Sequence, residues 1–262
     1  MARLIVLALA AGLAAALPDV GWAQVSLSTA INKSGRMRML SQRIIKAQAQ
    51  YSHGVLIDRA SDVLRTSVRE MGEGLDDLKR IQPNAEIRTT YAQLEAKARP
   101  FLAAAAVVAK LDAPRLAALN AQADEVLDLA HKLTGQYEQA GKAAGAKLIN
   151  VAGRQRMLSQ RMSKNYFLIH AAVPGVTQAE IARDQKEFVS ALAMLKSAPL
   201  TNSPIKQDLD LADVQWVFFE NALGVKTADR SALQNVATTS ERILEVMDDL
   251  TLQYDQALKD LL

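Results

Sequence analysis

The sequence predicts an all-α protein made of two tandem four-helix bundles. Three observations support this fold class. The composition favours helices, with many alanines, 12 glycines, 7 prolines and only 5% aromatic residues. Apolar residues recur at spacings of three and four, as in amphipathic helices, and no strand-like alternation appears. One segment is also written twice, which indicates two copies of one helical unit.

The first 23 residues are expected to be a signal peptide. Arg3 provides a positive start, Leu4 to Leu17 form an apolar run, and the segment ends with the small residues Gly21 and Ala23. That run of 14 residues is short for a membrane span, which needs about 20. We therefore expect cleavage after Ala23 and a periplasmic location, with an uncleaved anchor as the alternative. The absence of cysteine suits an oxidising compartment and excludes disulfides and thiolate chemistry.

The duplication defines the expected domains. Residues 31–46 read INKSGRMRMLSQRIIK and residues 149–164 read INVAGRQRMLSQRMSK, with eleven of sixteen positions identical. The similarity continues to residues 134–140 and 251–257, which read TGQYEQA and TLQYDQA. We expect a first domain over residues 24–140 and a second over residues 141–262.

Each unit divides into four amphipathic segments at its proline and glycine breaks. In the first unit these cover about residues 26–51, 58–80, 84–110 and 114 onward; in the second, breaks fall near residues 174–175, 199–204 and 224–229. No proline follows Pro114 before the second repeat, so we expect one long helix shared by both bundles. The alternative is a bend near Gly141 or Gly145 that lays the bundles side by side.

The repeated segments are basic, whereas the rest of the chain is acidic. Residues 20–57 and 139–179 contain no acidic side chains and together hold eleven of the 31 basic residues. The overall charge of +3 therefore hides two basic zones in an acidic scaffold. An acidic remainder in a secreted chain argues against nucleic-acid binding.

The basic residues of the first repeat share one side of the predicted helix. At about 100° per residue, Arg38 lies near Gly35 and Gln42, while Met37 and Leu40 face the opposite side. A guanidinium beside a glycine, with an amide one turn away, suits a small planar oxyanion, because the flat fork donates two parallel hydrogen bonds. The candidate ligand-binding residues are Gly35, Arg38, Arg43, Gly153, Arg156 and Arg161. The supporting candidates are Asn32, Arg36, Gln42, Asn150, Arg154 and Gln160.

A structural role is the alternative for these cations. Basic helical faces commonly pair with acidic faces of neighbouring helices. The carboxylates available for such pairing are Glu70, Glu73, Asp76, Asp77 and Glu187. The anion hypothesis instead requires Arg38 and Arg156 to converge, sheltered from water by Met39 or Met157.

The repeated motif resembles known sensor domains. Its Gly-Arg-x-Arg-Met-Leu-Ser-Gln-Arg form closely resembles the PilJ-type domain of type IV pilus chemotaxis transducers. It also resembles the signature in the first periplasmic helix of nitrate and nitrite sensor histidine kinases. The latter resemblance implies a four-helix periplasmic bundle that dimerises along this helix and holds one anion between glycine and arginine. Carried over, these are Gly35 with Arg38, and Gly153 with Arg156.

Two departures qualify this resemblance. The nitrate sensors carry Gln and Tyr where this chain has Leu40 and Gln42, or Leu158 and Gln160, so the motif is nearer to the PilJ form. The chain also shows no membrane span or output module after the repeats, so we expect it to need a membrane partner for signalling.

The leading functional hypothesis is a periplasmic binding protein that recognises nitrate, nitrite or a similar anion and acts with a membrane sensor or transporter. The alternative is an interaction module of a pilus, envelope or chemotaxis system without a small ligand, and a homodimer remains open in either case. No enzyme activity, cofactor or metal is expected, because His53, His131 and His170 appear isolated. The aromatic residues Trp216, Phe218 and Phe219 are expected to pack in the core.

Overall fold

The computed structural model describes residues 20–141, 144–227 and 229–261, and side chains from residue 27 onward apart from residue 144. The predicted signal peptide therefore lies largely outside the described residues. The described residues form eight α-helices and no strand, which confirms the all-α class. The helices are α1 (Val20–Ser52), α2 (Ile57–Leu78), α3 (Ala85–Ala105), α4 (Ala113–Gly141), α5 (Ala144–His170), α6 (Gln178–Lys196), α7 (Ser203–Leu223) and α8 (Arg230–Lys259).

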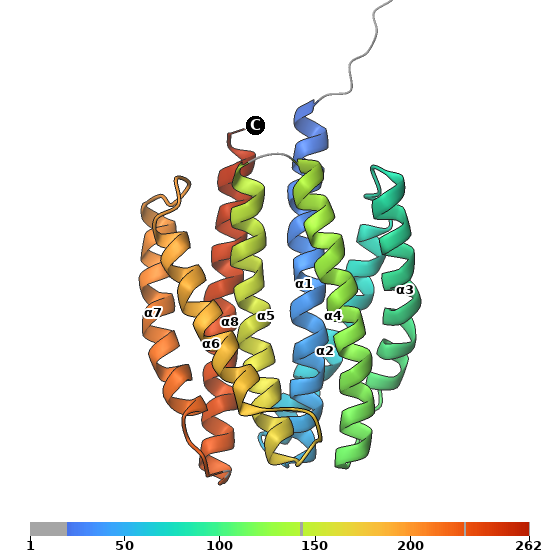
Figure 1. Cartoon of the computed structure of the whole chain (residues 1–262), viewed down its shortest axis with the longest axis vertical. Helices are drawn as coiled ribbons and strands as arrows, with labels where there is room; N and C mark the ends of the chain where they lie inside the picture. Colours follow the sequence, from blue (N-terminus) through green and yellow to red (C-terminus); the bar gives the residue numbers. More distant parts are fainter. Residues whose placement is uncertain (1–19, 142–143, 228, 262) are drawn as a thin grey trace, which may run out of the picture.

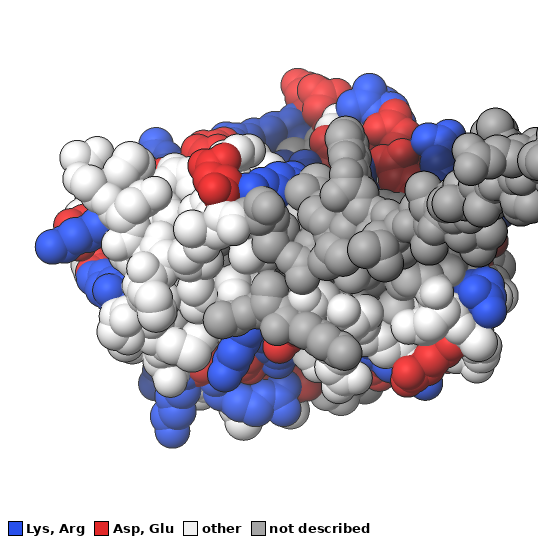
Figure 2. Space-filling model, turned by 90° about the horizontal axis from the view of Figure 1, so that it is seen from above, with Lys and Arg blue, Asp and Glu red and all other residues white. Residues whose placement is uncertain are grey.

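The helices form two four-helix bundles that lie side by side (Figure 1). In the first bundle α1 contacts α2 and α4, and α3 contacts α4; in the second, α5, α6, α7 and α8 repeat this arrangement. The two bundles meet mainly through α1 and α5, the helices that carry the repeated motif. Viewed from above, the molecule has an elongated outline, with basic and acidic side chains intermixed along both long edges (Figure 2).

The prediction of one long shared helix is wrong. Helix α4 ends at Gly141 and α5 begins at Ala144 and runs back alongside, which is the side-by-side alternative (Figure 1). Close packing near the start of α5 favours this arrangement. A Cβ on Gly145 would lie only 2.6 Å from Leu258 and 3.0 Å from Leu200, so a glycine is needed where α5 meets the end of α8. The reversal also lets the apolar surfaces of α1 and α5 bury one another.

Local sequence signals explain several helix starts. Asn84, Asn202 and Asp229 each accept a hydrogen bond from the backbone N–H three residues later, which satisfies a donor in the first turn. Glu180 accepts from the backbone N–H of Thr177 at the start of α6. Among the described residues, no helix is long and apolar enough to span a membrane.

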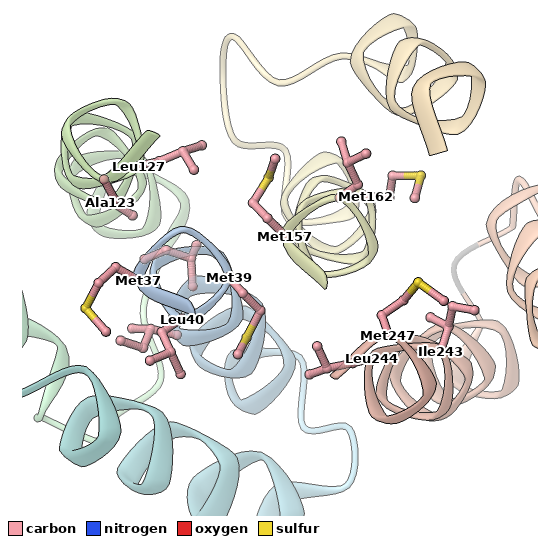
Figure 3. Close-up of a cluster of buried hydrophobic side chains, with 14 of the residues drawn as sticks. Met37, Met39, Leu40, Ala123, Leu127, Met157, Met162, Ile243, Leu244 and Met247 are labelled. Atoms are coloured by element: carbon pink, nitrogen blue, oxygen red, sulfur yellow. The ribbon is translucent and has the colours of Figure 1, made fainter. Parts of the chain in front are cut away.

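The core is continuous through both bundles and contains many methionines. Met39 on α1 faces α8 and Met157 on α5 faces α4, so each motif helix places a methionine toward the other bundle (Figure 3). Trp216 and Phe219 are buried as predicted, but Phe218 is wrongly assigned to the core and is 55% exposed. It lies on the outer face of α7, one residue away from the buried stripe. The largest fully buried side chains are not apolar; they are Arg38 and Arg156.

Candidate functional site

The motif helices α1 and α5 run parallel, so equivalent residues of the two repeats meet (Figure 1). The terminal nitrogens of Arg38 and Arg156 both lie beside Gly35 and Gly153. A Cβ built on Gly35 would be 3.1 Å from Nη2 of Arg38 and 3.5 Å from Nη2 of Arg156, and the values at Gly153 are 3.6 and 3.2 Å. Each glycine therefore lets two guanidinium groups approach the helix backbone. The structure thus brings together the four residues that the motif resemblance selected.

Arg156 is neutralised by a carboxylate. Its side chain is 1% exposed, and Nη1 donates to Asp248 of α8 at 2.5 Å. Nη2 donates to the side chain and the backbone carbonyl of Asn32, at 2.9 and 3.2 Å. Asp248 also pairs with Arg36. Burial acts to raise the pKa of Asp248, but the charges of Arg156 and Arg36 outweigh it and lower that pKa.

Arg38 is equally buried but forms no ion pair within the described part of the chain. Nη2 donates to the backbone carbonyl of Asn150 at 3.3 Å, and Nη1 lies 3.3 Å from Nδ1 of His131 on α4. That nitrogen accepts when the ring proton is on Nε2. Burial, followed by the charges of Arg154 and Arg156, lowers the pKa of Arg38 to about 9, so it remains protonated at neutral pH. Nε of Arg38 is buried without an acceptor among these residues.

The repeat alignment explains this difference. In the segment ending at residues 140 and 257 the two copies are offset by 117 residues, so His131 occupies the position of Asp248. The sequence interpretation of His131 as isolated is therefore wrong, since it contacts a buried arginine from another helix. The repeat itself carries the signal for this contact, because an offset of 117 residues aligns His131 with Asp248. Burial and the charges of Arg38 and Arg154 lower the pKa of His131, which favours a neutral ring.

The remaining candidate cations all pair with carboxylates, as the structural alternative expected. Arg43 and Lys46 both bind Glu241, and Arg161 binds the buried Asp184. Arg36 binds Glu70, and Arg154 binds Glu187 at the equivalent position of the second copy. Asp77 pairs with Lys33, whereas Asp76 and Glu73 pair with Arg99 and Arg69 and not with the motif.

The supporting amides occupy different places. Each asparagine accepts from the arginine of the opposite copy across the α1–α5 interface. Asn32 accepts from Arg156 through its side chain and its backbone carbonyl, and Asn150 accepts from Arg38 through its backbone carbonyl. Gln42 and Gln160 are buried one turn further along, and each donates to the preceding serine. The asparagines therefore line the arginine pair, while the glutamines lie outside its direct contacts.

Comparison with known proteins identifies the family. Two stretches, residues 20–126 and 139–241, match the family model described as type IV pili methyl-accepting chemotaxis transducer N-term, named PilJ. Neither curated proteins nor solved structures gave a match. Domains of this family are sensory and typically periplasmic. The two matched stretches cover most of the chain and include both motif helices, so the chain belongs to the PilJ family and carries two tandem copies of its domain.

Proposed function

We propose that this protein is a periplasmic sensor that binds one small oxyanion between α1 and α5. The observation that carries the proposal is Arg38, a fully buried cation without a carboxylate partner among the described residues. A buried charge that is not compensated destabilises a protein by several kcal/mol, so such groups are normally paired. A bound anion supplies the charge that Asp248 supplies to Arg156.

The chemistry of the surrounding groups supports a small planar anion. Nε of Arg38 and Nε of Arg156 are both buried and lack acceptors within the described structure. An oxyanion with two or three oxygens accepts from such guanidinium edges in a fixed geometry. Gly35 and Gly153 keep this region clear of Cβ atoms. Nitrate and nitrite have this size and shape, and we propose them as the first ligands to test.

The location of the site suits signalling. Arg38 contacts His131 on α4, and Arg156 contacts Asp248 on α8. A ligand at the arginine pair therefore contacts side chains that each reach a helix of a different bundle. A ligand shifts a conformational equilibrium only if it contacts the two states differently. An anion that draws Arg38 away from His131 provides such a difference. We propose that the readout is made by a membrane-bound partner, a sensor, transducer or transporter.

Isothermal titration calorimetry with nitrate and nitrite tests the ligand. The native protein is expected to release or absorb heat with a stoichiometry of one anion per chain. Replacing Arg38 by Met keeps the side-chain volume but removes the charge, and it is expected to abolish binding. Arg43→Met is the matched control, because Glu241 retains Lys46 and binding is expected to persist. A native protein that gives no heat with either anion overturns the proposal.

A second candidate function, an interaction module, is favoured by the outer face of α7. Leu211, Val214, Val217 and Phe218 are 44–55% exposed there, whereas the equivalent positions of α3 hold Gln93, Ala96, Arg99 and Pro100. The fold therefore does not require an apolar face at these positions. Three carboxylates also lie on α7: Asp210 and Asp213 pair with Lys196 of α6, and Glu220 has no ion pair with the described residues. We propose a partner helix with an apolar face flanked by basic residues.

Photo-crosslinking from position 214 tests this surface, with position 96 on α3 as the matched control. The expected product is a crosslink from position 214 only, to an amphipathic peptide rich in Lys or Arg. Equal crosslinking from both positions, or a partner peptide without basic residues, contradicts the interaction proposal.

A further inference from the structure

A polar cavity of about 360 Å³ lies among α4, α5, α6 and the turn that joins α5 to α6. Its charged lining residues are Asp124, Asp128, Arg161, Lys164, Glu180 and Arg183. None of them belongs to the arginine pair between α1 and α5. Pockets of a few hundred cubic ångströms are large enough for small-molecule ligands.

Lys164 gives this cavity a buried cation with spare hydrogen-bonding capacity. Its residue is 2% exposed, and its ammonium donates to Asp124 at 3.2 Å, the one partner found in the described structure. The equivalent Lys46 has two partners, Glu241 and the hydroxyl of Ser240. On α4, the buried Ala123 occupies the position equivalent to Ser240 and offers no hydroxyl. An ammonium can donate three hydrogen bonds, so Lys164 is less satisfied than its counterpart.

The lining of this cavity differs from the equivalent positions of the other copy. Three small residues line it, Ala117, Ala121 and Gly175, and the equivalent positions in the other copy hold Gln234, Thr238 and Ile57. Gln234 and Thr238 line a separate hollow of about 630 Å³ together with residues of α7 and α8, and Arg242 is the one charged residue in that lining. The cavity of about 360 Å³ therefore differs from the other copy in its charged lining. A hollow lined by charged groups costs packing contacts, which a bound molecule restores.

The charges of the lining are balanced, and α4 and α5 contribute opposite signs, while α6 contributes one charge of each sign, Glu180 and Arg183. Helix α5 contributes Arg161 and Lys164, whereas α4 contributes Asp124 and Asp128. Asp128 is exposed and forms no ion pair with the described residues. A polyanion or polycation would meet repulsion from one wall. A molecule with one carboxylate and one ammonium group matches both walls.

We propose that this cavity is a second ligand site, which binds a zwitterionic small molecule of the amino-acid class. The ligand's carboxylate accepts from Lys164 and from the guanidinium of Arg161 on α5. Its ammonium group donates toward Asp128 on the α4 side. This inference is independent of the oxyanion proposal, because it uses neither Arg38 nor Arg156.

Calorimetry on the full chain tests the inference, with each of the twenty proteinogenic L-amino acids titrated separately. At least one is expected to bind. Propionate and ethylamine, which carry only one of the two charged groups of L-alanine, are expected to give no heat. Absence of heat with all twenty amino acids overturns the proposal, and binding of propionate as tightly as any amino acid shows a simple anion site instead.

Variants then place the ligand. The double substitution Ala117→Gln and Ala121→Thr introduces the other copy's residues and adds larger side chains to the α4 wall of the cavity, and Lys164→Met removes the ammonium group. Each is expected to weaken binding at least about tenfold. Lys164→Met loses a charge-assisted hydrogen bond, and the double variant places larger side chains in the space available to the ligand. Lys46→Met is the matched control and is expected to bind normally. Unchanged binding in the double variant overturns the site assignment even if Lys164→Met does not fold.

Arg38→Met separates the two proposals. It is expected to abolish nitrate binding and leave amino-acid binding intact. Loss of amino-acid binding in Arg38→Met contradicts the independence of the two sites.

Discussion

The two copies of the domain surround chemically identical arginines with different partners. In the second copy Asp248 pairs with Arg156 and also reaches Arg36 of the first copy. In the first copy the equivalent residue is His131, which contacts Arg38 through a ring nitrogen and brings no negative charge. The backbones and the glycines are alike at both positions. The difference shows that one substitution on a neighbouring helix decides whether a buried arginine is internally neutralised.

The same comparison applies at the other polar positions. Glu70 and Glu187 are equivalent and both pair with the first arginine of their repeat. Asp184 binds Arg161, but its counterpart Ser67 carries no charge, and Arg43 pairs with Glu241 of the other copy instead. The duplicated fold therefore keeps its apolar core while the ion pairs differ between copies.

Replacing Asp248 by Asn is expected to lower the free energy of unfolding by about 2–3 kcal/mol, because it breaks an ion pair to a buried arginine. The side chain of Asp248 is 27% exposed, so solvent reduces the loss below that of a fully buried pair. Urea denaturation at pH 7 measures the change. The adjacent Asp249→Asn is the control and is expected to stay within about 0.5 kcal/mol of the native protein. An equal loss of unfolding free energy in Asp248→Asn and Asp249→Asn contradicts the inference that Asp248 neutralises the buried Arg156.

Replacing His131 by Asp makes the first copy resemble the second. The new carboxylate is expected to stabilise the ligand-free protein by about 1–2 kcal/mol through a charge-assisted hydrogen bond to Arg38. It also competes with the proposed oxyanion, so nitrate affinity is expected to fall at least about tenfold. Denaturation and calorimetry measure the two effects. His131→Asn adds no charge and is the control. If the His131→Asp protein is stabilised and still binds nitrate normally, Arg38 is not the ligand site.

Acid is expected to weaken the contact between α1 and α8. Burial acts to raise the pKa of Glu241, but the charges of Lys46 and Arg43 outweigh it and hold that pKa at about 2. A carboxyl group with a lowered folded-state pKa contributes stability above its ordinary value of 4.5, and this stability is lost as the pH falls toward 2. Denaturation at several pH values measures the slope. Glu241→Gln is expected to reduce the change of unfolding free energy with pH between pH 4.5 and 2. An unchanged slope in this variant contradicts the assignment of the acid sensitivity to Glu241.

The smallest effect is expected on the outer face of α7. Val217→Arg introduces the residue found at the equivalent position of α3. Because Val217 is 54% exposed, the free energy of unfolding is expected to change by no more than about 0.5 kcal/mol. Thermal denaturation measures this, with the buried Phe219→Ala as a control that is expected to lose about 3 kcal/mol or more. A large loss in Val217→Arg shows that the face is part of the core.

Much of the fold could be predicted from the sequence because helix periodicity and proline breaks are local signals. The expected interval between the segments of residues 58–80 and 84–110 coincides with the observed interval between α2 and α3. The reversal between α4 and α5 could not be predicted, because the glycines there permit both a continuous helix and a bend. The choice depends on burial of α1 against α5 and of Gly145 against Leu258, which are contacts between residues distant in the sequence.

The candidate site was only partly predictable. The repeated motif selected Gly35, Arg38, Gly153 and Arg156, which do converge. Helical spacing could not show which cations are neutralised by carboxylates, because those carboxylates lie on other helices. His131 and Asp248 lie on α4 and α8, about a hundred residues from the arginines that they contact, and their equivalence depends on a repeat offset that shifts by one residue.

Parallel pairing of α1 and α5 within one polypeptide gives the protein a property that two identical subunits lack. A symmetric homodimer must carry the same residue on both sides of its axis. A covalently joined pair can hold histidine on one side and aspartate on the other. Its interface also does not dissociate on dilution, so the occupancy of a ligand bound there depends on ligand concentration alone and not on protein abundance.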